Sequence, residues 1–123
     1  MRVVGVVSSH ATTYSDSLAA GYVVEAPVTT QLADGMACRV ADPEALAVRA
    51  PHINHIVQVS DAKVAAAMRA LFMYTHNVAV DAGAAALAAA LHERDELNGL
   101  QVGLALTGGN VDAPMFAGAL QAA

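Results

Sequence analysis

The run Gln101–Asn110 constrains the fold of this chain more than any other stretch. It passes from the apolar segment QVGLAL directly into Thr107, Gly108 and Gly109. A short apolar run bounded by glycines predicts a buried strand over 101–106. Two glycines allow a sharp turn or the close approach of another molecule. Since ligands of open α/β sheets bind at the carboxyl ends of strands, this turn is a candidate ligand contact, with a plain strand-to-helix turn as the alternative.

The rest of the chain alternates strands and helices. Alternation of this kind predicts an α/β fold, here a small, mostly parallel sheet with packed helices. Asp42 before Pro43, and Ser60 before an apolar-periodic run, are typical helix starts. Residues 22–42 have no clean period and are expected to be mostly loop. We expect strands over 2–7 and 56–59 and helices over 12–20, 43–50, 61–75, 83–92 and 114–120.

Length and composition limit the classes of function. With 123 residues the chain is expected to form one domain over 1–123. It is 56% hydrophobic and only 14% charged, so we expect an apolar surface covered by a second copy, giving a homodimer or larger assembly, or by a partner chain. A net charge of −5 with six Lys and Arg argues against a nucleic-acid or anionic-membrane surface. No apolar run reaches membrane-spanning length, and no signal-peptide pattern opens the chain.

Cysteine and histidine usage gives little sign of redox or metal chemistry. Cys38 is the single cysteine, which excludes an intramolecular disulfide and makes the cytoplasm the expected compartment. We interpret it as a small hydrophobe rather than a reactive thiol. His52 and His55 lack the further ordered ligands that a zinc site needs, so no metal site is predicted. Ser8-Ser9-His10 is not interpreted as hydrolase machinery, because a nucleophile and its base must be partners in space.

Four segments together resemble the C-terminal part of the threonine dehydratase family, pyridoxal-phosphate enzymes of the tryptophan-synthase-β fold that are related to serine racemase. Each segment alone is weak, but their order and spacing follow the family, and the resemblance covers nearly the whole chain. The matching segments are Leu32–Ala37 (LADGMA), Ile56–Asp61 (IVQVSD) leading into Ala65–Arg69, Ala82–Leu87 (AGAAAL) and Thr107–Asn110 (TGGN).

The resemblance implies a role for the glycine-rich turn. In the family a Ser, Thr or Cys at the position of Thr107 hydrogen-bonds the pyridine nitrogen of the cofactor, and a neutral hydroxyl does not keep that nitrogen protonated. Gly108 and Gly109 would adjoin it. Gly35 and Gly83 would bring backbone close to the ring, although Asp34-Gly35 is equally typical of an ordinary turn.

The resemblance also shows which family features have no counterpart here. Pyridoxal-phosphate chemistry needs a Schiff-base lysine, and the single lysine, Lys63, falls in the first turn of a capped helix, where a solvated side chain is expected. The glycine-rich phosphate cradle would precede the first strand, and no such loop is present. The resemblance therefore implies pyridoxal phosphate, but we do not expect this chain to bind it alone or to carry a catalytic residue.

Three positions of the matching part also depart from the family. Val7 and Thr13 occupy slots where the family commonly has acidic residues that help to hold a cation. Val80 occupies a slot that is usually Glu, and Asp81 the next one, unless the alignment slips by one residue. Residues that carry the fold persist here, while residues that carry chemistry are replaced.

Two hypotheses of function remain open. In the first, the chain is half of a split or truncated ammonia-lyase or racemase for threonine or serine, and another chain supplies the lysine. In the second, it is a non-catalytic domain derived from such an enzyme that acts by self-association or by binding a partner. A neighbouring reading frame with the lysine and the glycine-rich loop would favour the first. For the chain alone, the replaced residues favour the second.

Overall fold

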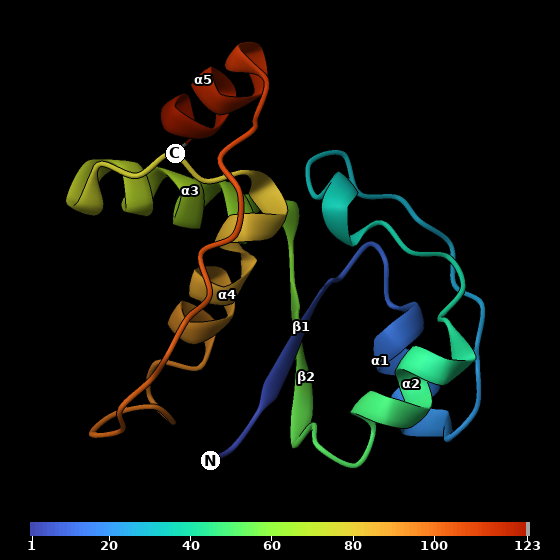
Figure 1. Cartoon of the computed structure of the whole chain (residues 1–123). Helices are drawn as coiled ribbons and strands as arrows, with labels where there is room; N and C mark the ends of the chain where they lie inside the picture. Colours follow the sequence, from blue (N-terminus) through green and yellow to red (C-terminus); the bar gives the residue numbers. More distant parts are fainter. Residues whose placement is uncertain (123) are drawn as a thin grey trace.

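The computed structural model describes residues 1–122, which form two strands, five α-helices and one short 3-10 helix (Figure 1). The expected order of strands and helices is confirmed, with one exception near the C-terminus. The elements are β1 (Val4–Ser8), α1 (Thr13–Ala20), η1 (Asp34–Met36), α2 (Pro43–Arg49), β2 (His55–Val59), α3 (Asp61–Thr75), α4 (Asp81–His92) and α5 (Ala113–Gln121).

The two strands form a parallel sheet between two helical layers. Val4 of β1 lies opposite His55 of β2, and Ser8 lies opposite Val59. Parallel neighbours need a crossover connection, and here the connection contains α1 and α2, which pack on each other. Figure 1 shows these two helices on one side of the sheet and α3, α4 and α5 on the other. The predicted small α/β fold with a parallel sheet is confirmed.

Local signals in the sequence set the helix boundaries correctly. The Asp42 carboxylate accepts a hydrogen bond from the Ala45 N–H at 2.8 Å, and Pro43 is the first helical residue of α2. Ser60 caps α3 in the same manner. Gly21 ends α1 with a left-handed φ of 80°. The helix expected over 83–92 begins two residues earlier, at Asp81.

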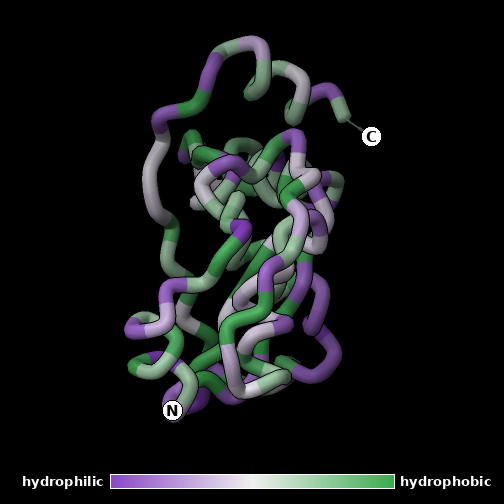
Figure 2. The backbone as a smooth tube through the Cα atoms, turned by 90° about the vertical axis from the view of Figure 1, so that its right-hand side faces the viewer, coloured by the Kyte–Doolittle hydropathy of each residue, from purple (hydrophilic) through white to green (hydrophobic). Residues whose placement is uncertain are grey.

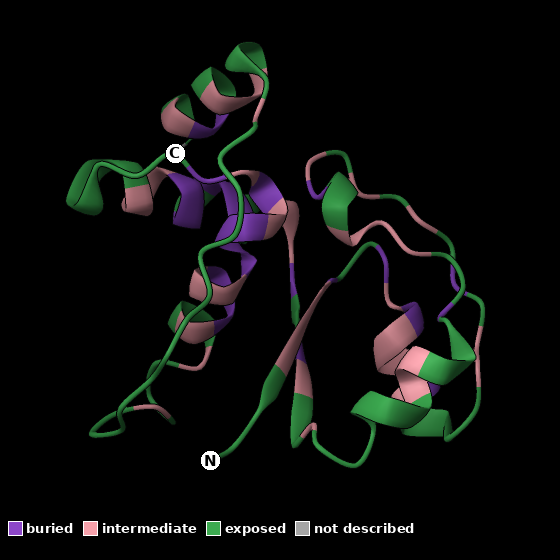
Figure 3. Cartoon of the chain, in the orientation of Figure 1, coloured by how far each residue is buried: buried purple, intermediate pink, exposed green. Residues whose placement is uncertain are grey.

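The hydrophobic core lies where α3 and α4 pack against β2. Alanines of α4 allow the two helices to approach closely, and Met68 and Val64 of α3 fill the space between them without solvent exposure. Phe116 of α5 packs edge-to-face on Phe72, with ring centroids 5.5 Å apart. Figure 3 shows the buried residues concentrated at this junction. Across residues 1–122, no helix has both the length and the apolar character required to cross a membrane.

The strand predicted over 101–106 is wrong for this structure. These residues are extended but pair with neither β1 nor β2, and every residue from 101 to 110 is exposed. In Figure 2 the stretch of chain that leads to α5 and the C-terminus follows the outer margin of the molecule. The sequence pattern is that of a strand, but a strand exists only where a neighbouring edge accepts its hydrogen bonds. The described part of the chain offers no such neighbour.

Candidate functional site

The glycines singled out from the sequence converge at the N-terminal end of α4. A Cβ added to Gly35 would lie 2.8 Å from the Cβ of Ala82, so η1 touches the first turn of this helix. A Cβ added to Gly83 would lie 1.9 Å from the carbonyl oxygen of Thr107. Both contacts require glycine because a methyl group would overlap atoms of the facing segment. Residues separated by more than 70 positions in the sequence thus meet at one place.

The Thr107 turn is held against this end of α4 by its backbone. The N–H of Val80 donates a hydrogen bond to the carbonyl oxygen of Gly108 at 3.1 Å. Gly108 has a left-handed φ of 69°, which bends the chain toward Gly109. A Cβ at Gly109 would lie 2.9 Å from the carbonyl oxygen of Val78. The structure therefore brings together all five glycine and threonine positions identified from the sequence, with the side chain of Thr107 exposed.

Asp81 adds a buried carboxyl group that sequence reasoning did not single out as functional. Its side chain is only 4% exposed and accepts a hydrogen bond from the N–H of Ala82. Burial raises the pKa of Asp81 above its ordinary value of 3.8, the hydrogen bond from Ala82 opposes that shift, and the carboxylates of Asp34 and Asp61 raise the pKa further. The only sequence signal was its place beside Val80, in a slot that is acidic in the family.

Asp61 connects the same region to the loop before η1. Its carboxylate accepts hydrogen bonds from the hydroxyl of Thr30 at 2.7 Å and from the N–H of Gln31 at 2.8 Å. These bonds hold the loop that leads to Gly35 against the start of α3. The site therefore has an acidic border made by three carboxyl groups from three elements.

The raised pKa of Asp81 predicts a pH-dependent stability. The folded state binds the proton of this carboxyl more tightly than the unfolded state, whose value is 3.8. The contribution of Asp81 to stability is therefore fully present below pH 3.8 and is lost as the pH rises through the raised folded pKa. Asp81→Asn keeps the hydrogen-bond acceptor without the charge. We expect its stability relative to the unsubstituted protein to increase as the pH rises through that window, measured by urea unfolding at a series of pH values.

Asp95→Asn is the matched control for this experiment, because it removes the same charge from a side chain that is 92% exposed. A constant stability difference between Asp81→Asn and the unsubstituted protein at all pH values would contradict the assignment.

Lys63, the single lysine, lies away from this site. Its Nζ is 2.6 Å from Nδ1 of His92, at the opposite end of α4 from Gly83, and its side chain is exposed. Nine residues of helix separate Gly83 from His92, which is about 13 Å at 1.5 Å per residue. The solvated position expected for Lys63 is confirmed. His55, weighed as a metal ligand, is paired instead with Glu93 at 2.7 Å.

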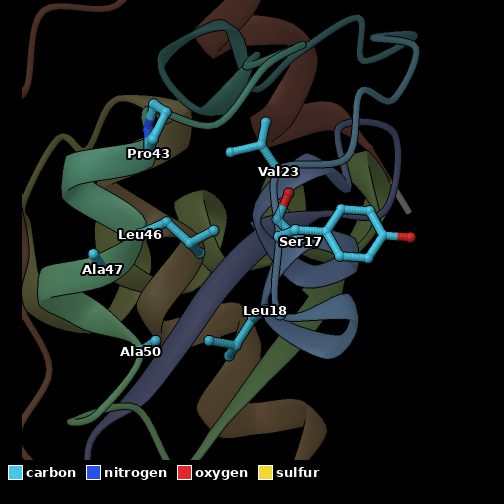
Figure 4. A pocket seen from close by; sticks show the side chains of 9 residues that line it. Ser17, Leu18, Val23, Pro43, Leu46, Ala47 and Ala50 are labelled. Atoms are coloured by element: carbon cyan, nitrogen blue, oxygen red, sulfur yellow. The ribbon is translucent and has the colours of Figure 1, made fainter.

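A hollow of about 310 Å³ lies between α1 and α2, on the other side of the sheet (Figure 4). Its walls are mainly apolar side chains, among them Leu18, Val23 and Leu46. The hydroxyl of Ser17 at its edge already hydrogen-bonds the backbone of Val24. None of the converging glycines or Thr107 lines it, so the hollow is separate from the candidate site.

Comparison with known proteins agrees with this architecture. Residues 1–108 match the family model described as "Pyridoxal-phosphate dependent enzyme". The chain is 34% identical over 113 residues to an L-threonine ammonia-lyase of Geobacter sulfurreducens and 30% identical over 111 residues to a beta-hydroxyaspartate dehydratase of Paracoccus denitrificans. These alignments cover 91% and 90% of the chain but only 28% and 35% of the relatives. The chain thus spans about a third of the length of the relatives that it matches.

Solved structures show the same relationship. A threonine deaminase whose source is given as T.th. superposes with a TM-score of 0.82 at 32% identity, covering 90% of this chain and 40% of that protein. Threonine deaminase isoform 2 of Solanum lycopersicum superposes with a TM-score of 0.89 over the whole chain and 36% of its own length, but at 22% identity it supports the fold alone. These neighbours confirm a tryptophan-synthase-β-like fold. With the family match over most of its length, this chain belongs to the family of pyridoxal-phosphate-dependent enzymes.

Proposed function

We propose that this chain is a threonine-dehydratase-like domain that forms the wall of a pyridoxal-phosphate site on the side of the pyridine nitrogen. The observation that carries the proposal is the convergence of Gly35, Gly83 and Thr107 at the start of α4. In this proposal the Thr107 hydroxyl faces the pyridine nitrogen. Gly108 and Gly109 shape the turn beside it, while Gly35 and Gly83 let the backbone approach the ring. The exposed hydroxyl of Thr107 is compatible with such a contact.

We further propose that these residues do not hold the cofactor or catalyse a reaction by themselves. The space beside Gly35 and Gly83 is taken up by Ala82 and the backbone of Thr107, so these glycines pack against the chain's own atoms rather than forming an open phosphate cradle. The amine that a Schiff base requires is about 13 Å away along α4 at Lys63. The residues therefore do not fit pyridoxal phosphate without a lysine and phosphate ligands from another polypeptide segment.

The test is the formation of 2-oxo acid from L-threonine and L-serine. The purified chain with added pyridoxal phosphate is expected to give no more product than the same concentration of pyridoxal phosphate alone. Lys63→Ala is the control for contamination by a full-length enzyme, because activity that survives this substitution does not come from Lys63. Turnover that exceeds free cofactor and disappears in Lys63→Ala would overturn the proposal.

The second candidate is half of a split ammonia-lyase or racemase, and the similarity to L-threonine ammonia-lyase and to two enzymes named for hydroxyaspartate favours it. Its substrates would be threonine, serine or related β-hydroxy amino acids. In this case co-expression with a polypeptide of the same family that carries the lysine and the glycine-rich loop restores turnover. Thr107→Ala would then lower the activity of the assembled enzyme, whereas the isolated chain would show none in either form.

A further inference from the structure

The exposed segment 100–106 has the side-chain pattern of a strand that lacks its neighbour. Its four large apolar side chains occur at every second position, which is the period of a strand rather than of a loop. Each of them is between 44% and 50% exposed: Leu100, Val102, Leu104 and Leu106. The intervening residues Gln101, Gly103 and Ala105 are small or polar.

The backbone of this segment is also unpartnered. Leu100 hydrogen-bonds Leu97, and Gly108 accepts from Val80, but within residues 1–122 no backbone hydrogen bond involves positions 101–107. Edge strands of natural proteins are commonly protected by charged residues or proline. Residues 99–109 contain neither. The segment thus combines an exposed apolar face with unpaired backbone groups and no protection against pairing.

The same chain carries an edge that such a strand could join. The sheet has two strands, so β1 pairs with β2 along one side only. Val3 and Val4 at the start of β1 are 41% and 36% exposed, while the apolar side chains of β2 are half-buried or buried. The chain also lacks charged side chains from Val3 to Ser8. The free edge of β1 is therefore the more apolar of the two edges.

We propose that segment 100–106 of one copy pairs as a strand with the free edge of β1 in a second copy of this chain. Donor and acceptor are present together in one chain but do not pair within it, so two copies can satisfy both edges reciprocally in a closed dimer. The inference specifies the partner in the self-association that forms part of the proposed function. A second copy is the occupant that the chain itself supplies.

The test uses the position of a single N–H group. Ala105→Pro removes one donor needed for strand pairing, while Ala105→Ser keeps it. Because residues 101–107 make no backbone hydrogen bonds within the described chain, both variants are expected to keep the circular dichroism spectrum and urea midpoint of the unsubstituted protein. Light scattering is expected to show a dimer or larger assembly for the unsubstituted protein and for Ala105→Ser. For Ala105→Pro it is expected to show a monomer, or dissociation at tenfold or more higher concentration.

Cysteine cross-linking identifies the pair of edges. Val4→Cys and Leu104→Cys, each in a Cys38→Ala background, are expected to form a mixed disulfide when combined. A monomeric unsubstituted protein, an unchanged assembly in Ala105→Pro, or disulfides only between identical variants would overturn the proposal. This result is independent of the proposed cofactor role, because molar mass is measured without pyridoxal phosphate and turnover is measured without reference to assembly.

Discussion

Gly83→Ala is expected to destabilise the protein by about 1–3 kcal/mol, the range typical of overpacking a close contact. The added methyl group would lie 1.9 Å from the carbonyl oxygen of Thr107 and 2.9 Å from its carbonyl carbon. Such overlap with backbone is not relieved by a change of rotamer. Either α4 or the Thr107 turn must move, and movement of the turn also costs the hydrogen bond between Val80 and Gly108. Urea unfolding measures the loss, and limited proteolysis at 100–110 reports release of the turn.

Gly118→Ala is the matched control, since it makes the same chemical change inside a helix. A Cβ at Gly118 meets no atom within 4 Å, so the higher helix propensity of alanine is expected to stabilise the protein by about 0.5–1 kcal/mol. Opposite signs for the two substitutions would separate the close approach at Gly83 from helix propensity. Equal stabilisation by both would show that the start of α4 does not touch the Thr107 turn.

Met68→Ala is expected to have the largest effect on stability, about 2–5 kcal/mol. Met68 has no solvent exposure and lies between α3, α4 and the sheet, where the neighbouring residues are mostly valine and alanine. These short side chains cannot reach into the space that the substitution leaves, so a cavity remains. A domain of this size has a total stability of about 5–15 kcal/mol, so the variant would lose a large share of it.

Met73→Ala, on the same helix with a side chain that is 57% exposed, is the control and is expected to change stability by less than about 0.5 kcal/mol. Chemical unfolding of both variants measures the contrast. Similar effects at the two positions would mean that the core does not lie between α3 and α4.

The sequence predicted those features of the fold that depend on neighbouring residues. The Asp42–Pro43 and Ser60 helix starts were correct because an N-cap hydrogen bond joins residues only three positions apart. The strand at 101–106 was not, because pairing depends on an edge that no local pattern reveals. β1 and β2, with less distinctive sequences, pair because the crossover places them side by side.

The candidate site was predicted in its residues but not in its geometry. Family resemblance pointed to Thr107 and to both Gly35 and Gly83, yet only the structure shows that the two glycines meet other segments at the same helical turn. The burial of Asp81 could not be predicted either. A carboxylate at a helix start is usually exposed and favoured by the helix dipole, and its burial here depends on packing by other elements.

The most direct test of the account is the absorption spectrum of the chain mixed with pyridoxal phosphate, followed by borohydride reduction and peptide mapping. The account predicts no Schiff-base band beyond that of free cofactor with an exposed amine, and no preferential, saturable labelling of Lys63. A saturable band with stoichiometric labelling of Lys63 would contradict it, because the amine would then have to reach a cofactor held by this chain alone.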